Sequence, residues 1–244
     1  MGNNSHLAGL LTGPARTSRS GLARRPHEGV KRSPASQGEL MRLFVAIAPP
    51  PPNVLDELDA RLEPLRAGRH DLRWTNREAW HVTLAFLGQV DETAAARLMP
   101  RLERAAHRHA QFRIAFAGAG AFPAATRANV LWSGLSGDRG ALGRLAESVA
   151  AGARRAGAPP PDKGRRFQPH LTLARCRMPA DVTELVAALS DYQGPPWTAD
   201  RVHLVRSRLG PTTLPRYTSL GDWPLRASGM PTPDADPDPP ADQP

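Results

Sequence analysis

The order of hydrophobic and polar residues predicts a chain in which strands and helices alternate. Short apolar, β-branched runs that stop at Gly or Pro are typical of buried strands, and longer segments repeat their apolar residues at helical spacing. A kink or break is expected near Pro100. This order argues for an α/β (α+β) fold. The predicted strands are 41–48, 80–87, 112–116, 130–135, 170–175, 201–207 and 217–220, and the predicted helices are 53–66, 91–109, 140–157 and 181–189.

The two ends of the chain lack this pattern. Residues 1–40 contain no Phe, Trp or Tyr and carry six basic and two acidic residues, whereas residues 227–244 hold six prolines and four aspartates. Such compositions cannot bury enough apolar area to fold. We therefore expect a disordered basic extension over 1–40, a folded domain over 41–226 and a disordered Pro/Asp-rich tail over 227–244.

Composition places the chain among globular proteins. Of its 244 residues, 40% are hydrophobic and 23% are charged, which is enough apolar material for a buried core. No apolar run approaches the roughly 20 residues of a membrane-spanning helix. Cys176 is the single cysteine, which excludes an intrachain disulfide and any Cys-rich metal site. We expect a cytoplasmic protein that does not contact a membrane, with a monomer as the default state.

The charge of the chain is strongly basic. The formal net charge is +9 and the isoelectric point is about 11.1. The charges of the two tails cancel, so the basic excess belongs to residues 41–226. Such a domain attracts phosphates, nucleic acid or an anionic membrane. Arginine together with abundant Ala, Gly and Pro is also what a GC-rich genome encodes, so charge alone does not select a partner.

One internal repeat carries the candidate chemistry. His81-Val-Thr-Leu-Ala85 and His170-Leu-Thr-Leu-Ala174 agree at four of five positions and lie 89 residues apart. This indicates a diverged duplication. In each copy the strand period of two places His and Thr on one face. If the two halves pack around a pseudo-twofold axis, two imidazoles and two hydroxyls meet in one cleft.

This pattern favours acid–base catalysis over a metal site. A single His-x-Thr would be explained by packing, but retention of the pair in both halves is not. Each motif offers one nitrogen ligand, and neither strand contains a Cys, Asp or Glu to complete a zinc sphere, so no metal or other cofactor is expected. Histidines with a pKa near 6.5 can act as general acid and general base. The pair suits hydrolysis of a phosphoester, with the threonine hydroxyls donating to phosphate oxygens.

The tandem motif resembles the signature of the two-histidine (2H) phosphoesterase superfamily. Its surroundings are similar to the RNA 2',3'-cyclic phosphodiesterase branch, the LigT-like proteins once described as 2'-5' RNA ligases. The similarity spans nearly the whole predicted core. The matching segments are Met41-Arg-Leu-Phe-Val-Ala, Trp74-Thr, Trp80–Gly88, Gly120-Ala-Phe-Pro with Val130-Leu-Trp, Phe167–Arg175, and Ser207-Arg-Leu with Pro215-Arg-Tyr.

The resemblance implies a fold and a reaction. The fold is bilobal and duplicated, with two antiparallel sheets flanking a central cleft and helices outside. The reaction is conversion of an RNA or nucleoside 2',3'-cyclic phosphate end to a 2'-phosphate, in which His81 is the general acid toward O3' and His170 is the general base for water. Thr83 and Thr172 would hold the phosphate, and Arg175 would contact phosphate or nucleotide.

The position of Arg175 raises a geometric question. It follows His170 by five residues, so in a regular strand its side chain points away from the His-Thr face. It therefore needs a twist, a bulge or the end of the strand to reach the cleft. Its counterpart in the first repeat is Phe86.

Residues outside the motifs are further candidates for contacts with the substrate. Lys163, Arg165 and Arg166 are candidates for tracking a phosphate backbone, and Phe122 for stacking on a terminal base. The alternatives are a solvated basic loop and a core Phe. Tyr217 is likewise open to packing or binding, and four of the five tryptophans are assigned to the core. The rival functions are another phosphoester as substrate (a 2'-5' linked oligonucleotide or an ADP-ribose cyclic phosphate), RNA end joining by the reverse reaction, and an RNA-binding module without turnover.

Overall fold

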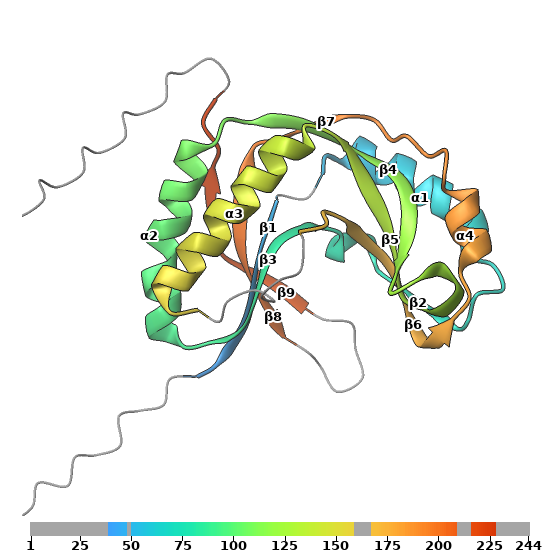
Figure 1. Cartoon of the computed structure of the whole chain (residues 1–244), viewed down its shortest axis with the longest axis horizontal. Coiled ribbons are helices and arrows are strands. Elements are labelled where there is room, and N and C mark those ends of the chain that lie inside the picture. The colour runs from blue at the N-terminus through green and yellow to red at the C-terminus, as the bar shows by residue number, and fades with distance from the viewer. Residues whose placement is uncertain (1–38, 48–49, 159–166, 209–215, 228–244) are drawn as a thin grey trace, which may run out of the picture. The chain divides into compact units, whose positions relative to one another are not determined.

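A computed structural model describes residues 39–47, 50–158, 167–208 and 216–227, all within the unit of the chain that begins at Gly38 (Figure 1). Helices and strands alternate as predicted, and the α/β class is confirmed. The strands are β1 (Met41–Ile47), β2 (Leu72–Trp74), β3 (Val82–Val90), β4 (Phe112–Phe122), β5 (Ala128–Gly137), β6 (Leu171–Ala180), β7 (Trp197–Ala199), β8 (Arg201–Arg208) and β9 (Arg216–Pro224). The α-helices are α1 (Pro52–Arg66), α2 (Glu92–Arg108), α3 (Arg139–Ala156) and α4 (Thr183–Ala188), with short 3-10 turns at Arg77–Ala79 and Ala125–Arg127.

The strands form one antiparallel hydrogen-bonded series that has a narrow middle. Its order is β7-β4-β5-β6-β3-β1-β8-β9, and β2 pairs with β6 beside this path. The pairing between β3 and β6 consists of one residue pair, Val82 with Leu171. Two antiparallel halves of this one sheet are therefore joined at the point where the two His-x-Thr motifs begin, which is compatible with the two sheets that the resemblance implies.

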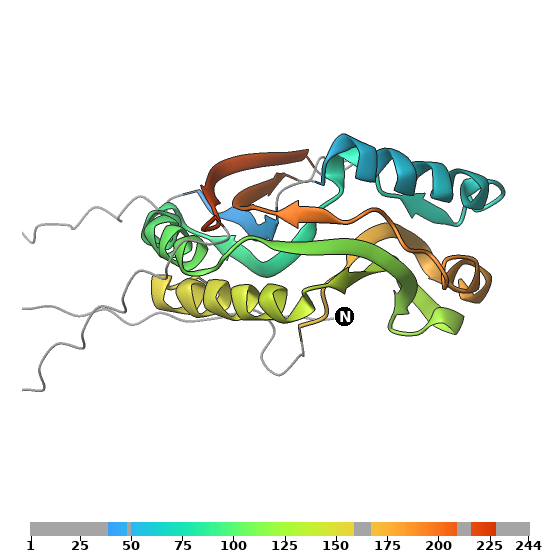
Figure 2. The ribbon, with the colours of Figure 1, turned by 90° about the horizontal axis from the view of Figure 1, so that it is seen from above.

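The helices lie outside the two halves (Figures 1 and 2). On one half, α2 packs against β8 and β9, and α3 packs against β3. On the other half, α1 and α4 lie side by side, and Arg61 of α1 donates a hydrogen bond of 2.7 Å to the Ala188 carbonyl of α4. The apolar stripe of α1 contributes Val54, Leu58 and Leu62 to the core. The helices thereby cover the apolar faces of the strands.

Each motif strand contains a β-bulge at the same position of the repeat. In the pairing of β1 with β3, Ala46 stands opposite Thr83, and the next residue of β1, Val45, stands opposite Ala85. Leu84 is therefore an extra residue on β3. In the pairing of β5 with β6, Trp132 stands opposite Thr172, and Leu131 stands opposite Ala174. Leu173 is therefore an extra residue on β6. A bulge inserts one residue, so the side chains beyond it exchange faces. The duplication thus extends to a detail of the backbone.

Several predicted boundaries change because tertiary contacts decide them. The second helix continues through Pro100 without interruption, and β4, β5, β6 and β9 are longer than their apolar runs. The sequence did not predict β2 and β7, because each has three residues and is defined by its pairing with β6 or β4. The third helix ends as predicted at Gly157, which adopts a left-handed φ of 80°.

Candidate active site

The pairing of β3 with β6 brings the two motifs together. Val82 and Leu171 stand directly opposite each other, and each is 1% exposed, so both side chains enter the core. Alternation along each strand turns the neighbouring residues toward the other face. In this antiparallel register His81 lies across from Thr172, and His170 lies across from Thr83. Each histidine is the residue immediately before its strand. Four partly buried polar side chains thus share one face as predicted: His81, Thr83, His170 and Thr172.

The same hydrogen bond orients both imidazoles. Nδ1 of His81 lies 2.7 Å from the Ala79 carbonyl oxygen, and Nδ1 of His170 lies 2.8 Å from the Gln168 carbonyl oxygen. A carbonyl oxygen can only accept, so Nδ1 carries the proton in each ring. Nε2 is consequently the atom that gains or loses a proton in both histidines. This is the tautomer that a catalytic imidazole needs when a second group positions it.

Aromatic rings hold His81 in place. The Phe44 ring stacks on the imidazole with a centroid distance of 4.6 Å, and Tyr217 meets it edge-on at 5.2 Å. Phe44 and Tyr217 also contact each other edge-on at 5.2 Å. Rotation of the imidazole is therefore restricted by two rings as well as by its hydrogen bond. Tyr217 thus packs against the ring of a catalytic candidate.

A second aromatic pair holds His170. Phe122 meets its imidazole edge-on at 5.1 Å, Trp132 lies 6.2 Å from it, and the two aromatic rings are 5.2 Å apart. Trp132 is partly buried and packs beside the site, outside the hydrophobic core. Trp132 is opposite Gly120 on β4, where an added Cβ would overlap the indole ring. The Gly in the family stretch that begins at Gly120 thus makes room for the ring that supports His170.

The bulge at Leu173 resolves the position of Arg175. On β5, Trp132 and Val130 share a face, and they stand opposite Thr172 and Arg175 respectively. Thr172 and Arg175 therefore also share a face, which a regular strand would not allow. The guanidinium charge lowers the pKa values of both His81 and His170, which places it within electrostatic reach of both rings. Of the three alternatives that the sequence left open, a twist, a bulge or the end of the strand, the structure contains the bulge.

Burial controls the protonation of the two histidines. It lowers the pKa of His81, and the positive charges of His170 and Arg175 lower that pKa further, while the hydrogen bond to Ala79 acts in the opposite direction. Burial and Arg175 likewise lower the pKa of His170. Both imidazoles are therefore neutral at pH 7 when no anion is bound. An arriving phosphate would favour protonation of one of them.

Phe86 occupies in the first half the place that Arg175 occupies in the second. It follows the bulge at Leu84, its ring lies 6.2 Å from that of Phe44, and its side chain is 56% exposed. An exposed ring beside a catalytic candidate can stack on a nucleobase. Phe122 is partly covered by its contact with Trp132, so a role as a stacking platform is less available to it. Lys163, Arg165 and Arg166 lie outside the described residues.

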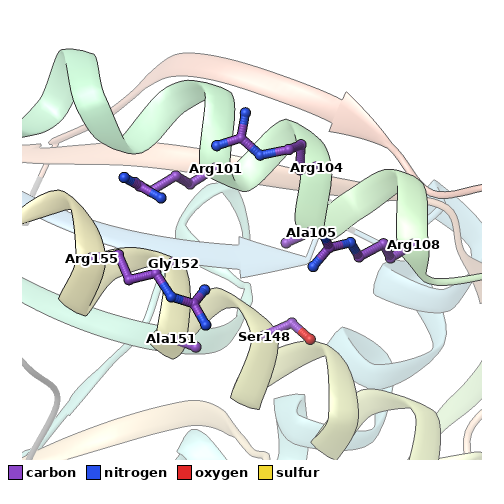
Figure 3. Close-up of a pocket in the computed structure, with 8 residues that line it drawn as sticks. All are labelled: Arg101, Arg104, Ala105, Arg108, Ser148, Ala151, Gly152 and Arg155. Carbon is purple, nitrogen blue, oxygen red and sulfur yellow. The ribbon is translucent and has the colours of Figure 1, made fainter. Parts of the chain in front are cut away.

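Two cavities of about 290 Å³ each are rich in arginine. The first adjoins the histidine site and is lined by Arg73, Arg175, Cys176 and Arg177. The second lies between α2 and α3 (Figure 3) and is lined by Arg101, Arg104, Ala105, Arg108, Ser148, Ala151, Gly152 and Arg155. Since α3 packs on β3, the sheet separates this second cavity from the histidines.

The described residues offer neither a cluster of metal ligands nor a membrane-spanning helix. Across the described segments, three or more His, Cys, Asp or Glu side chains do not gather anywhere in a way that could hold a metal ion. Nor does any helix within those segments have the length and apolar character required to cross a bilayer.

Comparison with known proteins identifies similar chains. The family model described as 2'-5' RNA ligase superfamily matches residues 54–211. The RNA 2',3'-cyclic phosphodiesterase of Thermus thermophilus is 32% identical over 196 residues, which are 76% of this chain and 91% of that protein. The protein of the same name from Aeropyrum pernix is 38% identical over 114 residues, which are 47% of this chain and 62% of its own length. The crystal structure of E. coli LigT complexed with 3'-AMP superposes with a TM-score of 0.62 at 25% identity, over 77% of this chain and 99% of that one.

Proposed function

This chain belongs to the 2'-5' RNA ligase superfamily, and on that basis we propose that it hydrolyses RNA 2',3'-cyclic phosphate ends to 2'-phosphates by two-histidine acid–base catalysis. The observation that carries the proposal is the Val82–Leu171 pair, because it gathers two imidazoles and two threonines on one face. The relatives from Thermus thermophilus and Aeropyrum pernix, which bear the name RNA 2',3'-cyclic phosphodiesterase, support the choice of substrate.

The proposed reaction is a single displacement at phosphorus. Nε2 of neutral His170 takes a proton from water while the water oxygen forms a bond to phosphorus. The bond between phosphorus and O3' breaks, and Nε2–H of protonated His81 gives its proton to O3'. The product carries a 2'-phosphate and a 3'-hydroxyl. The assignment of acid to His81 and base to His170 follows the family resemblance.

The remaining polar groups of this face would stabilise the charge that develops on the phosphate. The hydroxyls of Thr83 and Thr172 would donate hydrogen bonds to its non-bridging oxygens, and the guanidinium of Arg175 would add a positive charge. Phosphate binding would also raise the pKa of His81, so that the acid becomes protonated in the complex. These groups perform the chemistry with protein side chains, so independence of a metal ion is part of the proposal.

The test is hydrolysis of a nucleoside 2',3'-cyclic phosphate in the presence of EDTA. His81→Ala and His170→Ala should each lower kcat by roughly 10²- to 10⁴-fold, the usual contribution of an acid or base. His107→Ala is the matched control, because His107 is exposed on α2, and it should retain wild-type turnover. The phosphate in the product should be on O2', which nuclear magnetic resonance of phosphorus identifies.

Each contrary outcome points to a rival. Loss of turnover in EDTA would support a metal-dependent reaction. A 3'-phosphate product would contradict the roles given to the leaving oxygen and to His81. If neither the mononucleotide nor a longer cyclic-phosphate-ended RNA is hydrolysed while RNA still binds, the domain is a binding module.

A further inference from the structure

Three arginines continue the face of the histidines toward β2. Arg73 on β2 stands directly opposite Arg175 on β6, so their side chains share a face. Arg177 follows Arg175 by two residues on the same strand and shares that face as well. The cavity that these arginines line has a volume of about 290 Å³, near the lower end of the roughly 300–1,000 Å³ of ligand pockets.

The charge of this cluster is not compensated within the described part of the protein. Among the described residues, no carboxylate forms an ion pair with Arg73, Arg175 or Arg177. Asp71 has its backbone next to Arg177, but its carboxylate is bound by Arg69 through bonds of 2.9 and 2.8 Å. The remaining lining residue, Cys176, is uncharged, because burial raises the pKa of its thiol. Of the four residues that line the cavity, three therefore carry a positive charge and none carries a negative charge.

Such an arrangement costs stability unless an anion binds. Like charges directly opposite each other on neighbouring strands are destabilising. Arg175 is already engaged with the reacting phosphate in the proposed function, so Arg73 and Arg177 require a second negative group close to the first. A polyanion with regularly spaced phosphates meets this requirement, whereas a mononucleotide with one cyclic phosphate does not.

Position in the sheet separates this cavity from the other arginine-rich one. The arginines between α2 and α3 (Figure 3) lie behind the sheet, where a ligand bound at the histidines does not reach. By contrast, Val130 on β5, Arg175 on β6 and Arg73 on β2 form one row across three neighbouring strands. This row is adjacent to the row that contains Trp132 and Thr172.

We propose that Arg73 and Arg177 bind the backbone phosphate that precedes the terminal nucleotide of the RNA, next to Arg175, which contacts the reacting phosphate. This inference rests on the proposed function. A 2',3'-cyclic phosphate closes the 3' end of an RNA, so every other backbone phosphate of the substrate lies on the 5' side of the terminal ribose. The preferred substrate is accordingly an oligonucleotide with at least one internal phosphodiester. Arg73 and Arg177 would bind that phosphodiester and so favour oligonucleotides over mononucleotides.

The experiment compares two substrates in each protein. One is a nucleoside 2',3'-cyclic phosphate, and the other is a dinucleotide that ends in the same cyclic phosphate. The wild type should have the higher kcat/KM on the dinucleotide. In Arg73→Ala and in Arg177→Ala the ratio of kcat/KM between dinucleotide and mononucleotide should fall about tenfold, as expected for loss of one hydrogen bond to a charged group.

Two controls make the result specific. Arg113→Ala removes an exposed arginine on β4 that lines neither cavity, and it should leave the ratio at its wild-type value. A dinucleotide with an uncharged methylphosphonate linkage should show in the wild type the same loss that the arginine variants show. The salt dependence of log(kcat/KM) on the dinucleotide should become shallower by about one in each arginine variant.

The outcomes separate this proposal from the proposed function. Turnover of the mononucleotide with a ratio that is unchanged in both arginine variants would overturn the phosphate-binding role and leave the proposed function intact. If neither substrate is turned over, the proposed function fails. In that case the affinities for a dinucleotide and a mononucleotide 2'-phosphate decide whether Arg73 and Arg177 still select the additional phosphate, and equal affinities in wild type and variants would overturn the proposal.

Discussion

At the scale of single residues, the two imidazoles are positioned alike, but their pKa values are too low for one of them to be protonated at neutral pH without a bound anion. Each donates Nδ1–H to the carbonyl of the residue two positions earlier, and burial together with Arg175 lowers the pKa of both. Histidines with an ordinary pKa near 6.5 would share one proton near neutrality. Here burial and Arg175 favour the neutral form of both rings at pH 7, so the proposed acid, His81, would acquire its proton with the substrate.

This predicts the pH dependence of the reaction. The value of kcat/KM, which reports the free enzyme, should follow a bell with its maximum below pH 6.5, because both pKa values lie below the ordinary one. The maximum of kcat should lie at a higher pH, since the bound phosphate raises the pKa values in the complex. Arg175→Gln should move both limbs of the kcat/KM profile to higher pH. A maximum of kcat/KM above pH 7, or limbs that do not move in this variant, would contradict the electrostatics described.

At the scale of the elements, the site depends on irregularities within the strands. The bulges at Leu84 and Leu173 exchange the faces of the residues beyond them, which brings Phe86 and Arg175 onto the side of the histidines. Without the bulge, Arg175 would point toward the helices. The close approach of β4 and β5 at Gly120 similarly gives the Trp132 ring its place.

Gly120→Ala should lower kcat by about tenfold or more. The new methyl group would overlap the indole of Trp132, and a displaced indole would no longer support the ring of His170, the proposed general base. Gly143→Ala is the matched control, because a Cβ at Gly143 meets nothing within 4 Å and alanine favours the helix. Turnover measured below the melting temperature of each variant tests this. Wild-type kcat in Gly120→Ala would show that Trp132 does not position the imidazole.

At the scale of the whole molecule, burial of histidines couples folding to pH. Burial lowers the pKa values of four partly buried histidines: His81, His109, His170 and His203. In the unfolded chain these groups bind protons near pH 6.5, so the unfolded state binds more protons than the folded state below that pH. Their contribution to stability is complete above pH 6.5 and is lost as the pH falls toward the lowered values of the folded state.

The melting temperature should therefore fall between pH 7 and pH 5, a window in which Asp and Glu remain ionised for the most part. The double variant His81→Asn, His170→Asn lacks two of the titrating groups, so its melting temperature should fall less steeply over this range of pH. Thermal unfolding in buffers without phosphate or sulfate measures it, because an anion bound at the site would stabilise the protonated form. A melting temperature that is constant or rises over this window would contradict the assignment.

Much of the fold and the candidate catalytic groups follow from the sequence alone, because both are recorded in local patterns. Apolar periodicity located the principal helices and strands, and the left-handed cap at Gly157 ended α3 where a glycine was expected. The repeated His-x-Thr indicated the duplication and placed each His beside its Thr, since the alternation of side chains is a property of any extended strand. The family resemblance added the roles of acid and base.

The tertiary structure decided what these residues face. The contact of Val82 with Leu171 joins positions 89 residues apart, and the two bulges and the strands β2 and β7 exist through their pairing. Trp132 looked like a core residue because hydrophobicity does not reveal that a glycine opposite leaves room for it beside His170. The pairing of Arg73 with Arg175 was likewise absent from the sequence analysis. Periodicity is a property of one segment, whereas register and burial depend on partners that the chain supplies only after it has folded.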